Sequence, residues 1–254
     1  MALHERIWRR RRRPVGSAVS LDLLGQVPFD VKEAIDTVRS FTMIDPLRLA
    51  MLYGLAREVS TKRIEGDIVE CGVCNGGSAA LMAAAVGRDT DRRLWLYDTF
   101  EGIPAPGPRD GSLAPTYSGT LRGSIESVRT VLAKVGFPLE RVVVRKGLFK
   151  STFREPLPQH VALLHVDADW YESVLDSLRT FYPLAGEGGI IVLDDFGHWE
   201  GAREAFYDFC GEQQIKPLLE RVGYTQAFWR KGQTQARSTK KVYEAGIYRL
   251  LFER

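Results

Sequence analysis

Short apolar runs alternate with amphipathic segments along most of the chain, from about residue 66 onward. Continuous apolar runs bounded by polar residues are typical of buried strands, whereas apolar residues three or four positions apart indicate helices. The strand-like runs are 68–71, 94–97, 142–144, 162–166 and 190–193, and the helical segments are 78–86, 125–135, 173–181 and 202–209. This repeated strand–helix alternation predicts an α/β fold with a mostly parallel, doubly wound sheet.

The two ends of this pattern differ from its middle. Residues 217–222 and 226–229 flank a Gly-Tyr pair and predict an antiparallel hairpin that finishes the sheet. Before residue 66 the pattern predicts helices packed over the sheet, notably at 46–59. Residues 103–123 contain Gly, Pro and Ser without periodicity, so we expect a long loop of the kind that forms a lid or is disordered.

The composition is that of an ordinary enzyme-sized domain. With 254 residues, 44% of them hydrophobic and 26% charged, the chain can bury a large core, and we expect one elaborated domain. The net charge is +3, and part of the basic excess lies in the arginine run 9–13, which is typical of a solvated terminus. Apart from Trp8, this run lacks the aromatic residues of a surface that binds single-stranded nucleic acid, so no nucleic-acid partner is expected.

Neither a membrane segment nor a disulfide framework is predicted. No apolar run reaches the length of a membrane span, and residues 1–14 have no apolar stretch of a secretory signal, so we expect a cytoplasmic protein without a membrane partner. Cys71, Cys74 and Cys210 are an odd number in a chain of this size, which argues against a disulfide framework. Cys71 and Cys74 have Cys-x-x-Cys spacing, but no second Cys/His pair completes a zinc set.

Two pairs of aspartates follow two of the apolar runs, 161–166 and 189–193. They are Asp167, Asp169, Asp194 and Asp195. If these runs are neighbouring parallel strands, the carboxylates meet at one edge of the sheet. A hard divalent cation such as Mg²⁺ favours an all-oxygen site of this kind. The alternative is that the aspartates cap the next helices, although capping explains one Asp per turn and not two pairs.

A Gly-rich segment, 70–78, joins the first predicted strand to a helix. Gly72 allows a sharp turn, Gly76 and Gly77 let a ligand approach the backbone, and Ser78 can satisfy amides at the helix start. The spacing differs from the dinucleotide fingerprint, and no Lys follows to make a phosphate loop. Glu70 at the strand end would repel a pyrophosphate but attract the ammonium group of an amino acid.

A second acid ends the next predicted strand, in the sequence Tyr97-Asp98-Thr99-Phe100. An acid at this place can accept hydrogen bonds from both hydroxyls of a ribose. An amino-acid group bound near Glu70 and a ribose bound near Asp98 together indicate S-adenosylmethionine. The alternative is that Glu70 and Asp98 are only helix-capping or loop acids.

These motifs, in this order, resemble the macrocin O-methyltransferase family of metal-dependent sugar and small-molecule methyltransferases of natural-product biosynthesis. The resemblance covers about residues 41–231 and rests on Thr42-Met43, the 70–78 loop, Asp98-Thr99-Phe100-Glu101-Gly102, Gly147-Leu148-Phe149-Lys150, Asp167-Ala168-Asp169-Trp170-Tyr171-Glu172-Ser173 and Asp194-Asp195-Phe196. It implies a class I methyltransferase fold, a seven-stranded mixed Rossmann-like sheet with N-terminal helices and a C-terminal hairpin. Residues 1–40 are then a basic tail and helical extension, 41–231 the methyltransferase domain, and 232–254 a C-terminal extension of it.

The same resemblance implies a set of site residues. Mg²⁺ is expected on Asp167, Asp194 and Asp195. S-Adenosylmethionine contacts are expected from Thr42, Met43, Glu70, Gly72, Ser78, Asp98, Thr99, Phe100, Leu148, Phe149 and Asp167. The implied reaction moves a methyl group to a hydroxyl of a (deoxy)sugar on a natural product such as an antibiotic glycoside, and the family implies a homo-oligomer.

Alternatives stay open at the acceptor site. Adjacent phenolic hydroxyls of a catechol chelate Mg²⁺ as sugar diols do, and a non-catalytic binding protein on the same fold is a further alternative. For the general base, Asp169 and His198 are the two choices, unless ionisation by the metal alone is sufficient. A histidine after a strand end is often only a surface loop residue. His165, inside a strand, is expected to be a packed core histidine.

A few residues depart from the family pattern or have two interpretations. Cys74 stands where relatives often carry an aromatic residue, and Leu148 stands where they often carry Trp, so adenine packing is expected to differ. Tyr117 and Trp170 are either apolar walls for a ring substrate or, respectively, an exposed loop residue and a helix-packing residue. Residues 242–252 are either an additional strand or a partner-binding segment.

Overall fold

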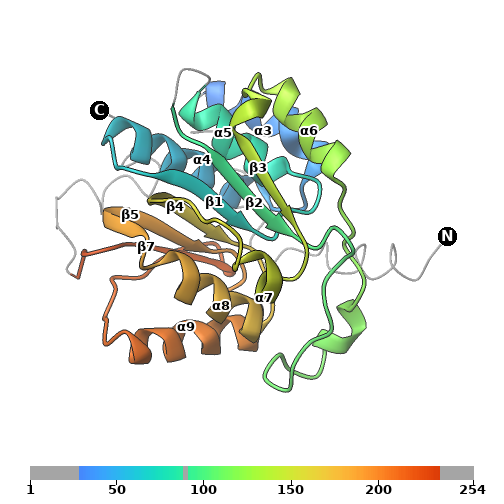
Figure 1. Cartoon of the computed structure of the whole chain (residues 1–254), viewed down its shortest axis with the longest axis vertical. Coiled ribbons are helices and arrows are strands. Elements are labelled where there is room, and N and C mark those ends of the chain that lie inside the picture. Colours follow the sequence, from blue (N-terminus) through green and yellow to red (C-terminus); the bar gives the residue numbers. More distant parts are fainter. Residues whose placement is uncertain (1–28, 88–90, 235–254) are drawn as a thin grey trace.

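The computed structural model describes residues 29–87 and 91–234. Its centre is a seven-stranded sheet with the strand order β3-β2-β1-β4-β5-β7-β6 (Figure 1). The strands are β1 (Asp67–Cys71), β2 (Leu94–Asp98), β3 (Val142–Lys146), β4 (Val161–Val166), β5 (Ala185–Leu193), β6 (Glu220–Val222) and β7 (Gln226–Arg230). Strands β1 to β5 are parallel and β7 is antiparallel to β5 and β6, so the predicted mixed sheet with a C-terminal hairpin is confirmed.

Helices cover both faces of this sheet (Figure 1). One face carries α3 (Phe29–Val38), α4 (Pro46–Thr61), α5 (Gly77–Val86) and α6 (Ile125–Lys134), and the other carries α7 (Phe149–Thr152), α8 (Tyr171–Phe181) and α9 (Glu200–Glu212). Short 3-10 helices lie at Arg39–Phe41, Ala114–Tyr117 and Leu139–Arg141. Each face has its own apolar core, so the chain forms three layers with the sheet buried between helices.

Three boundaries differ from the sequence prediction. β5 begins at Ala185, because the glycines at 186, 188 and 189 hide its first half from a hydrophobicity pattern. β6 is shorter than the predicted run 217–222, which begins with a proline that has no amide hydrogen for a ladder bond. α7 was not predicted, because four residues are too few to show a helical period.

The carboxyl ends of β1, β4 and β5 are aligned. Cys71 pairs with Val166, and Val166 pairs with Leu193. The ladder continues by one residue, since the amide of Asp167 donates to Cys71 O at 2.8 Å and that of Asp194 donates to Val166 O at 2.9 Å. The chain order of the strands reverses between β1 and β4, and ligands of open α/β sheets bind outside the strand ends at such a switch point.

The long loop at 103–123 is present and is anchored to the rest of the chain. Ile103 and its neighbours close the base of the loop, because the amide of Ile103 donates to Thr120 O at 2.9 Å and the amide of Gly119 donates to Ile103 O at 2.8 Å. The indole of Trp170 donates to Pro104 O at 2.8 Å. These hydrogen bonds fit a loop that forms a lid better than a disordered loop. Its closure over an acceptor stays a prediction.

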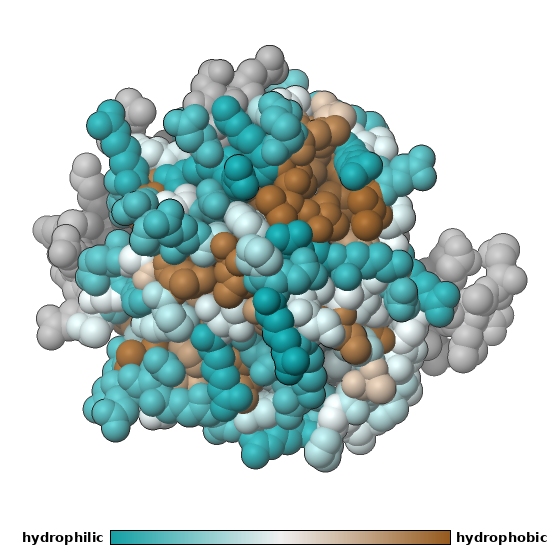
Figure 2. All heavy atoms as spheres, in the orientation of Figure 1, coloured by the Kyte–Doolittle hydropathy of each residue, from teal (hydrophilic) through white to brown (hydrophobic). Residues whose placement is uncertain are grey.

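Hydrophilic residues cover most of the face shown in Figure 2, with separate apolar patches between them, as on most folded proteins. Within residues 29–87 and 91–234, none of the helices combines the length and the apolar character needed to cross a bilayer. Cys71, Cys74 and Cys210 are free thiols. The arginine run 9–13 and the segment 242–252 lie outside the described residues.

Candidate active site

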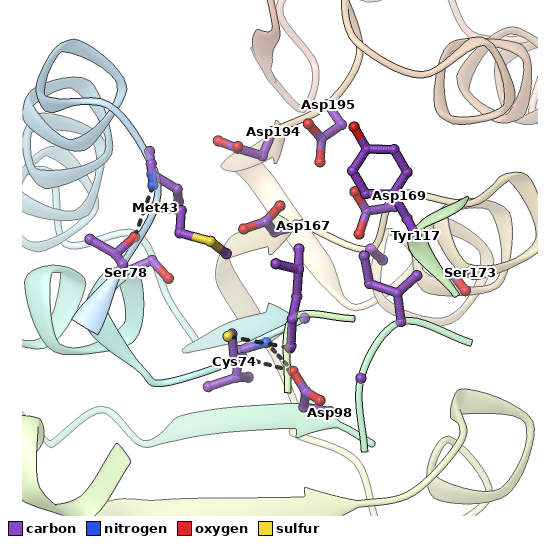
Figure 3. Close-up of a pocket in the computed structure, with 18 of the residues that line it drawn as sticks. Met43, Cys74, Ser78, Asp98, Tyr117, Asp167, Asp169, Ser173, Asp194 and Asp195 are labelled. Carbon is purple, nitrogen blue, oxygen red and sulfur yellow. Dashed lines mark hydrogen bonds between the residues drawn. The ribbon is translucent and has the colours of Figure 1, made fainter. Parts of the chain in front are cut away.

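The carboxyl ends of β1, β2, β4 and β5 open into a cavity of about 620 Å³. Small-molecule sites typically measure about 300–1,000 Å³. The segment before α4, the loops after these strands, the 103–123 loop and the turn before β7 form its walls (Figure 3). The predicted site residues that line it are Thr42, Met43, Gly72, Ser78, Asp98, Thr99, Leu148, Phe149, Asp167, Asp169, Asp194, Asp195 and His198. Glu70 and Phe100 do not line it.

Three aspartates converge at the ends of β4 and β5. One carboxylate oxygen from each of Asp167, Asp194 and Asp195 lies within 4.8 Å of the other two. Figure 3 shows these side chains around one region of the cavity, with Asp169 beside them. The helices that follow have Trp170 and Trp199 at their N-cap positions and no cap hydrogen bond from those side chains. The predicted cluster is therefore confirmed, and its interpretation as helix caps is wrong.

Burial and mutual repulsion decide the protonation of this cluster. Burial raises the pKa of Asp167, and the charges of Asp194 and Asp195 raise it further. Burial and then the charge of Asp194 raise the pKa of Asp195 to about 6. The pKa of Asp194 is lowered, because the positive charges of Arg48 and His165 outweigh its burial. The cluster therefore has more carboxylate than cation around it, and its all-oxygen donor set fits a hard divalent ion.

Arg48, in the first turn of α4, pairs directly with this cluster. Its guanidinium pairs with Asp194, and its Nε lies 2.6 Å from Oδ2 of Asp45. Gln226 in β7 donates a hydrogen bond of 2.9 Å to Oδ1 of Asp194. Asp194 is thus held from both α4 and β7. Sequence reasoning missed Arg48 and Gln226, because neither belongs to a Gly-rich or acidic motif.

Asp169 stands in a tight turn between β4 and α8. Its φ of 56° lies in the left-handed region, which is uncommon for a residue other than glycine. Oδ1 of Asp169 accepts a hydrogen bond of 2.8 Å from the indole Nε1 of Trp199. Burial raises the pKa of Asp169 well above its ordinary value, and the charge of Asp195 acts in the same direction. A carboxylate with a raised pKa is a stronger base than an exposed one.

The two histidines of the sequence analysis lie in different surroundings. His198 lines the cavity, and its ring contacts that of Trp199 at a centroid distance of 4.6 Å. His165 is fully buried in β4, as predicted, but it is not surrounded by apolar groups alone. Its Nδ1 lies 2.8 Å from Oε1 of Glu70, and its Nε2 lies 3.7 Å from Oδ1 of Asp194, beyond hydrogen-bonding distance. Despite its burial, the attraction of these two carboxylates raises the pKa of His165 to about 9.

Glu70 is completely buried beside His165 and does not line the cavity. Its second oxygen, Oε2, is buried without a hydrogen-bond partner in the described part of the chain. A buried, unpaired carboxylate oxygen is costly, and an ammonium group would satisfy it. Contact of Glu70 with the amino-acid part of the cofactor stays a prediction, which this unpaired oxygen favours.

The glycines of the 70–78 loop have two roles, a sharp turn at Gly72 and close packing at Gly76 and Gly77. Gly72 makes the predicted sharp turn with φ +89°, and a Cβ there would lie 1.9 Å from the carbonyl oxygen of Asp167. Gly76 and Gly77 do not line the cavity, and protein atoms fill the space where a side chain would lie, so the approach of a ligand to these two glycines stays a prediction without support from the cavity. A Cβ on Gly76 would lie 2.9 Å from Val128, and one on Gly77 would lie 2.7 Å from Thr42.

Ser78 does not have the capping role that the sequence suggested. Gly76 is the N-cap residue of α5, and no side chain caps this helix. Ser78 lies inside the first turn, is almost completely buried, and lines the cavity. It therefore belongs to the cavity wall rather than to the helix cap.

Asp98 lines the cavity and accepts hydrogen bonds from three backbone amides. Its Oδ2 accepts hydrogen bonds from the amides of Val73 and Cys74 at 2.7 and 2.8 Å, and its Oδ1 accepts one from the amide of Phe100 at 2.6 Å (Figure 3). The side chain of Phe100 packs in the core. Phe100 therefore acts on the site through its backbone amide, and Asp98 fixes the 70–78 loop in addition to its predicted contact with a ribose.

Aromatic side chains form one wall of the cavity beside Asp169. Trp199 has ring contacts with Tyr117 at a centroid distance of 5.1 Å and with Trp170 at 5.0 Å. Tyr117 and Trp199 line the cavity, whereas Trp170 is buried behind them and does not line it. The cavity-wall interpretation therefore holds for Tyr117, and the packing interpretation holds for Trp170. Sequence reasoning missed Trp199, which lies in no recognised motif.

Comparison with known proteins agrees with this geometry. The family model described as macrocin-O-methyltransferase matches residues 31–231. The chain is 31% identical over 204 residues to the 8-demethyl-8-(2,3-dimethoxy-alpha-L-rhamnosyl)-tetracenomycin-C 4'-O-methyltransferase of Streptomyces olivaceus, covering 78% of each protein. It is 29% identical over 198 residues to the demethyldecarbamoylnovobiocin O-methyltransferase of Streptomyces niveus, covering 75% of each.

A solved structure supports the same assignment. The structure of the O-methyltransferase NovP superposes with a TM-score of 0.69 at 30% sequence identity, over 76% of this chain and 83% of NovP. The family model covers well over half of the chain and includes both the 70–78 loop and the aspartate cluster. The chain therefore belongs to the macrocin O-methyltransferase family and is an S-adenosylmethionine-dependent O-methyltransferase.

Proposed function

We propose that this enzyme transfers the methyl group of S-adenosylmethionine to a sugar hydroxyl of a glycosylated natural product, with Mg²⁺ held by Asp167, Asp194 and Asp195. The observation that carries the proposal is the cluster of three carboxylates within 4.8 Å of one another in the wall of the same cavity as the 70–78 loop. The names of the two relatives describe O-methylation of a rhamnosyl-tetracenomycin C and of demethyldecarbamoylnovobiocin, respectively, and support a sugar as the acceptor.

The methyl donor is proposed to occupy the part of the cavity over β1 and β2. Asp98 would accept a hydrogen bond from its ribose through Oδ1, because the two amides on Oδ2 use its lone pairs whereas Oδ1 accepts only one backbone hydrogen bond. Phe149 and Leu148 line the same cavity and would pack against the adenine. Met43 and Ser78 line it and would contact the amino-acid end of the donor.

The acceptor is proposed to lie between the aspartate cluster and the aromatic wall of Tyr117 and Trp199. When bound, Mg²⁺ would supply positive charge that lowers the pKa of the reacting hydroxyl and fixes its position. Apolar walls suit a deoxysugar, whose ring has one apolar face, while carboxylates suit its hydroxyls. The loop 103–123 contributes Tyr117 and covers this side of the cavity, which limits the access of water.

Asp169 is proposed to take the proton of the reacting hydroxyl. It lines the cavity beside the cluster, and its raised pKa makes it a stronger base than an exposed carboxylate. The indole of Trp199 holds Oδ1 of this carboxylate and thereby fixes its orientation. His198 lines the same cavity and is the second choice of base.

The test is an acceptor panel with purified enzyme, S-adenosylmethionine and Mg²⁺. Rhamnosylated or other deoxysugar glycosides with a free diol are compared with a catechol and with the corresponding aglycones, and products are located by mass spectrometry and NMR. The proposal predicts methylation on the sugar of at least one glycoside and none on its aglycone. Turnover of the catechol together with an inert glycoside panel would move the assignment to phenol methylation. The expected homo-oligomer stays a prediction that light scattering of the same preparation checks.

A further inference from the structure

Asp110, in the 103–123 loop, is a buried carboxylate outside the cavity. Only 2% of its surface is exposed, although it belongs to a surface loop. Its Oδ1 accepts a hydrogen bond of 2.6 Å from the amide of Tyr171, and its Oδ2 accepts one of 2.7 Å from the amide of Gly107. Tyr171 is the first residue of α8. Asp110 therefore caps a helix that lies 61 residues further along the chain.

The two helices at this place lack caps of their own. α8 and α9 have Trp170 and Trp199 at their N-cap positions, and neither indole makes a cap hydrogen bond. Because the first amides of a helix need acceptors and the N-terminus is partly positive, a carboxylate is favourable there. Asp110 supplies this carboxylate to α8 through the amide of Tyr171.

Asp110 also lies against the start of α9. A Cβ on Gly201, the second residue of α9, would lie 2.2 Å from Oδ1 of Asp110 and 3.1 Å from the amide nitrogen of Tyr171. Only glycine leaves room for the carboxylate at this position. Asp110 is therefore wedged between the first turns of two neighbouring helices.

The acceptor and the donor of the hydrogen bond at the proposed base lie just before α8 and α9, respectively. Asp169 lies two residues before Tyr171, and Trp199 lies directly before α9. The indole of Trp199 donates to the carboxylate of Asp169 at 2.8 Å. The distance between the two helix starts therefore determines whether this hydrogen bond forms.

We propose that Asp110 is a positioning residue that fixes the starts of α8 and α9 and thereby the Trp199–Asp169 hydrogen bond. Through the same contacts it holds the loop 103–123, which contributes Tyr117, over the acceptor side of the cavity. This inference rests on the proposed role of Asp169 as general base. It assigns Asp110 no contact with the methyl donor, since Asp110 does not line the cavity.

The chain offers a matched control for this role. Arg109, the neighbour of Asp110, has its Nη1 2.7 Å from Oδ2 of Asp208 in α9, and the hydroxyl of Tyr171 donates to the same oxygen at 2.8 Å. This ion pair also joins the loop to α9, but Arg109 and Asp208 are 47% and 42% exposed, whereas Asp110 is almost completely buried. Asp208→Asn therefore removes a surface link between the same elements and leaves the buried carboxylate in place.

Steady-state kinetics in a double-mutant cycle test the link to Asp169. Asp110→Asn and Asp110→Ala are expected to lower kcat by about tenfold to 100-fold, as a displacement of catalytic groups does, while the Kd for S-adenosylmethionine stays within about twofold. In an Asp169→Asn background, Asp110→Ala should have little further effect on kcat, because both changes act on the same step. Asp208→Asn should leave kcat unchanged. Fully additive losses would overturn the proposal.

Hydrogen exchange provides a readout that does not need turnover. Peptides that contain residues 169–173 and 198–203 should exchange faster in Asp110→Ala than in the wild type, but not in Asp208→Asn. Gly201→Ala, which displaces the carboxylate from the other side, should give the same pattern if Asp110→Ala fails to fold. Unchanged exchange in both Asp110→Asn and Gly201→Ala would overturn the proposal. Full turnover of Asp169→Asn would contradict the role of Asp169 as general base but not the positioning role of Asp110. The hydrogen-exchange comparison would then test Asp110 by itself.

Discussion

Arg230 in β7 and Glu58 in α4 form a two-pronged ion pair across 172 residues of sequence. Nε of Arg230 donates to Oε1 of Glu58 at 2.8 Å, and Nη2 donates to Oε2 at 2.7 Å. Both side chains are mostly buried, with exposures of 17% and 9%, so solvent screens the pair weakly. The pair fastens the C-terminal hairpin to α4, the helix whose first turn places Arg48 against Asp194. The antiparallel end of the sheet is therefore connected to the site.

Glu58→Gln should lower the free energy of unfolding by about 1–3 kcal/mol at neutral pH, because a charge-assisted bidentate pair becomes a neutral hydrogen bond. Burial alone would raise the pKa of Glu58, but the hydrogen bonds and charges of Arg230 and, to a lesser extent, Lys62 outweigh it and lower the pKa. A lowered folded-state pKa gives stability that is present above the unfolded-state pKa and is lost as pH falls through the folded-state value. The stability gap should therefore close in acid.

Urea unfolding of both proteins from neutral to acidic pH measures this gap. Glu65→Gln is the control, because Glu65 is 82% exposed and only faces His160 at 3.6 Å. It should change stability by less than about 1 kcal/mol at any pH. A Glu58→Gln gap that persists unchanged below the pKa of a free Glu would contradict the electrostatic account of this pair.

Asp98→Asn should weaken binding of S-adenosylmethionine by about tenfold or more, because hydrogen bonds to a charged acceptor contribute about 1.5–3 kcal/mol each. Asp98→Ala should weaken it further, since the amides of Val73, Cys74 and Phe100 also lose their acceptor. Calorimetric titration gives the dissociation constants. Glu101→Gln, an exposed change three residues along the chain, is the control and should bind normally. Normal binding by Asp98→Ala would show that the ribose lies elsewhere.

Asp169→Asn should lower kcat by about 100-fold to 10,000-fold, the usual contribution of a general base, with little change in cofactor affinity. His198→Ala should retain most of the turnover. The reverse pattern would move the base to His198, and two active variants would mean that no protein base is required. Rapid-quench measurement of the methylated product separates the chemical step from product release.

Much of the fold could be predicted from the sequence, because most of the strands from β1 to β5 are short apolar runs and helical segments lie between most of them. The aspartate cluster could also be predicted, because residues that directly follow neighbouring parallel strands meet at the carboxyl edge of the sheet. Periodicity could not give the glycine-rich start of β5 or the four-residue α7. It also could not tell that Gly76 and Gly77 make room for Val128 and Thr42, which depends on packing between distant segments.

The residues missed at the site share one physical cause. Arg48, Gln226 and Trp199 contact Asp194 or Asp169 across 30 to 146 residues of sequence, and none of the three lies in a local motif. Asp110 was missed for the same reason, since it caps α8 from a loop far from it. One local sign was available. Trp170 and Trp199 are poor N-cap residues, so the helices that follow them required an acceptor from elsewhere.

Metal titration of the wild type and of Asp194→Asn tests whether the three-aspartate cluster binds the Mg²⁺ that methyl transfer requires. Mg²⁺ binding is measured by calorimetry on protein stripped with EDTA, and methyl transfer is measured on the same samples before and after Mg²⁺ is restored. The wild type should bind Mg²⁺ at one site and regain turnover when Mg²⁺ is restored. Asp194→Asn should fold but neither bind Mg²⁺ nor turn over. Full turnover of the wild type in EDTA, with no metal left by elemental analysis, would contradict the proposed Mg²⁺ dependence.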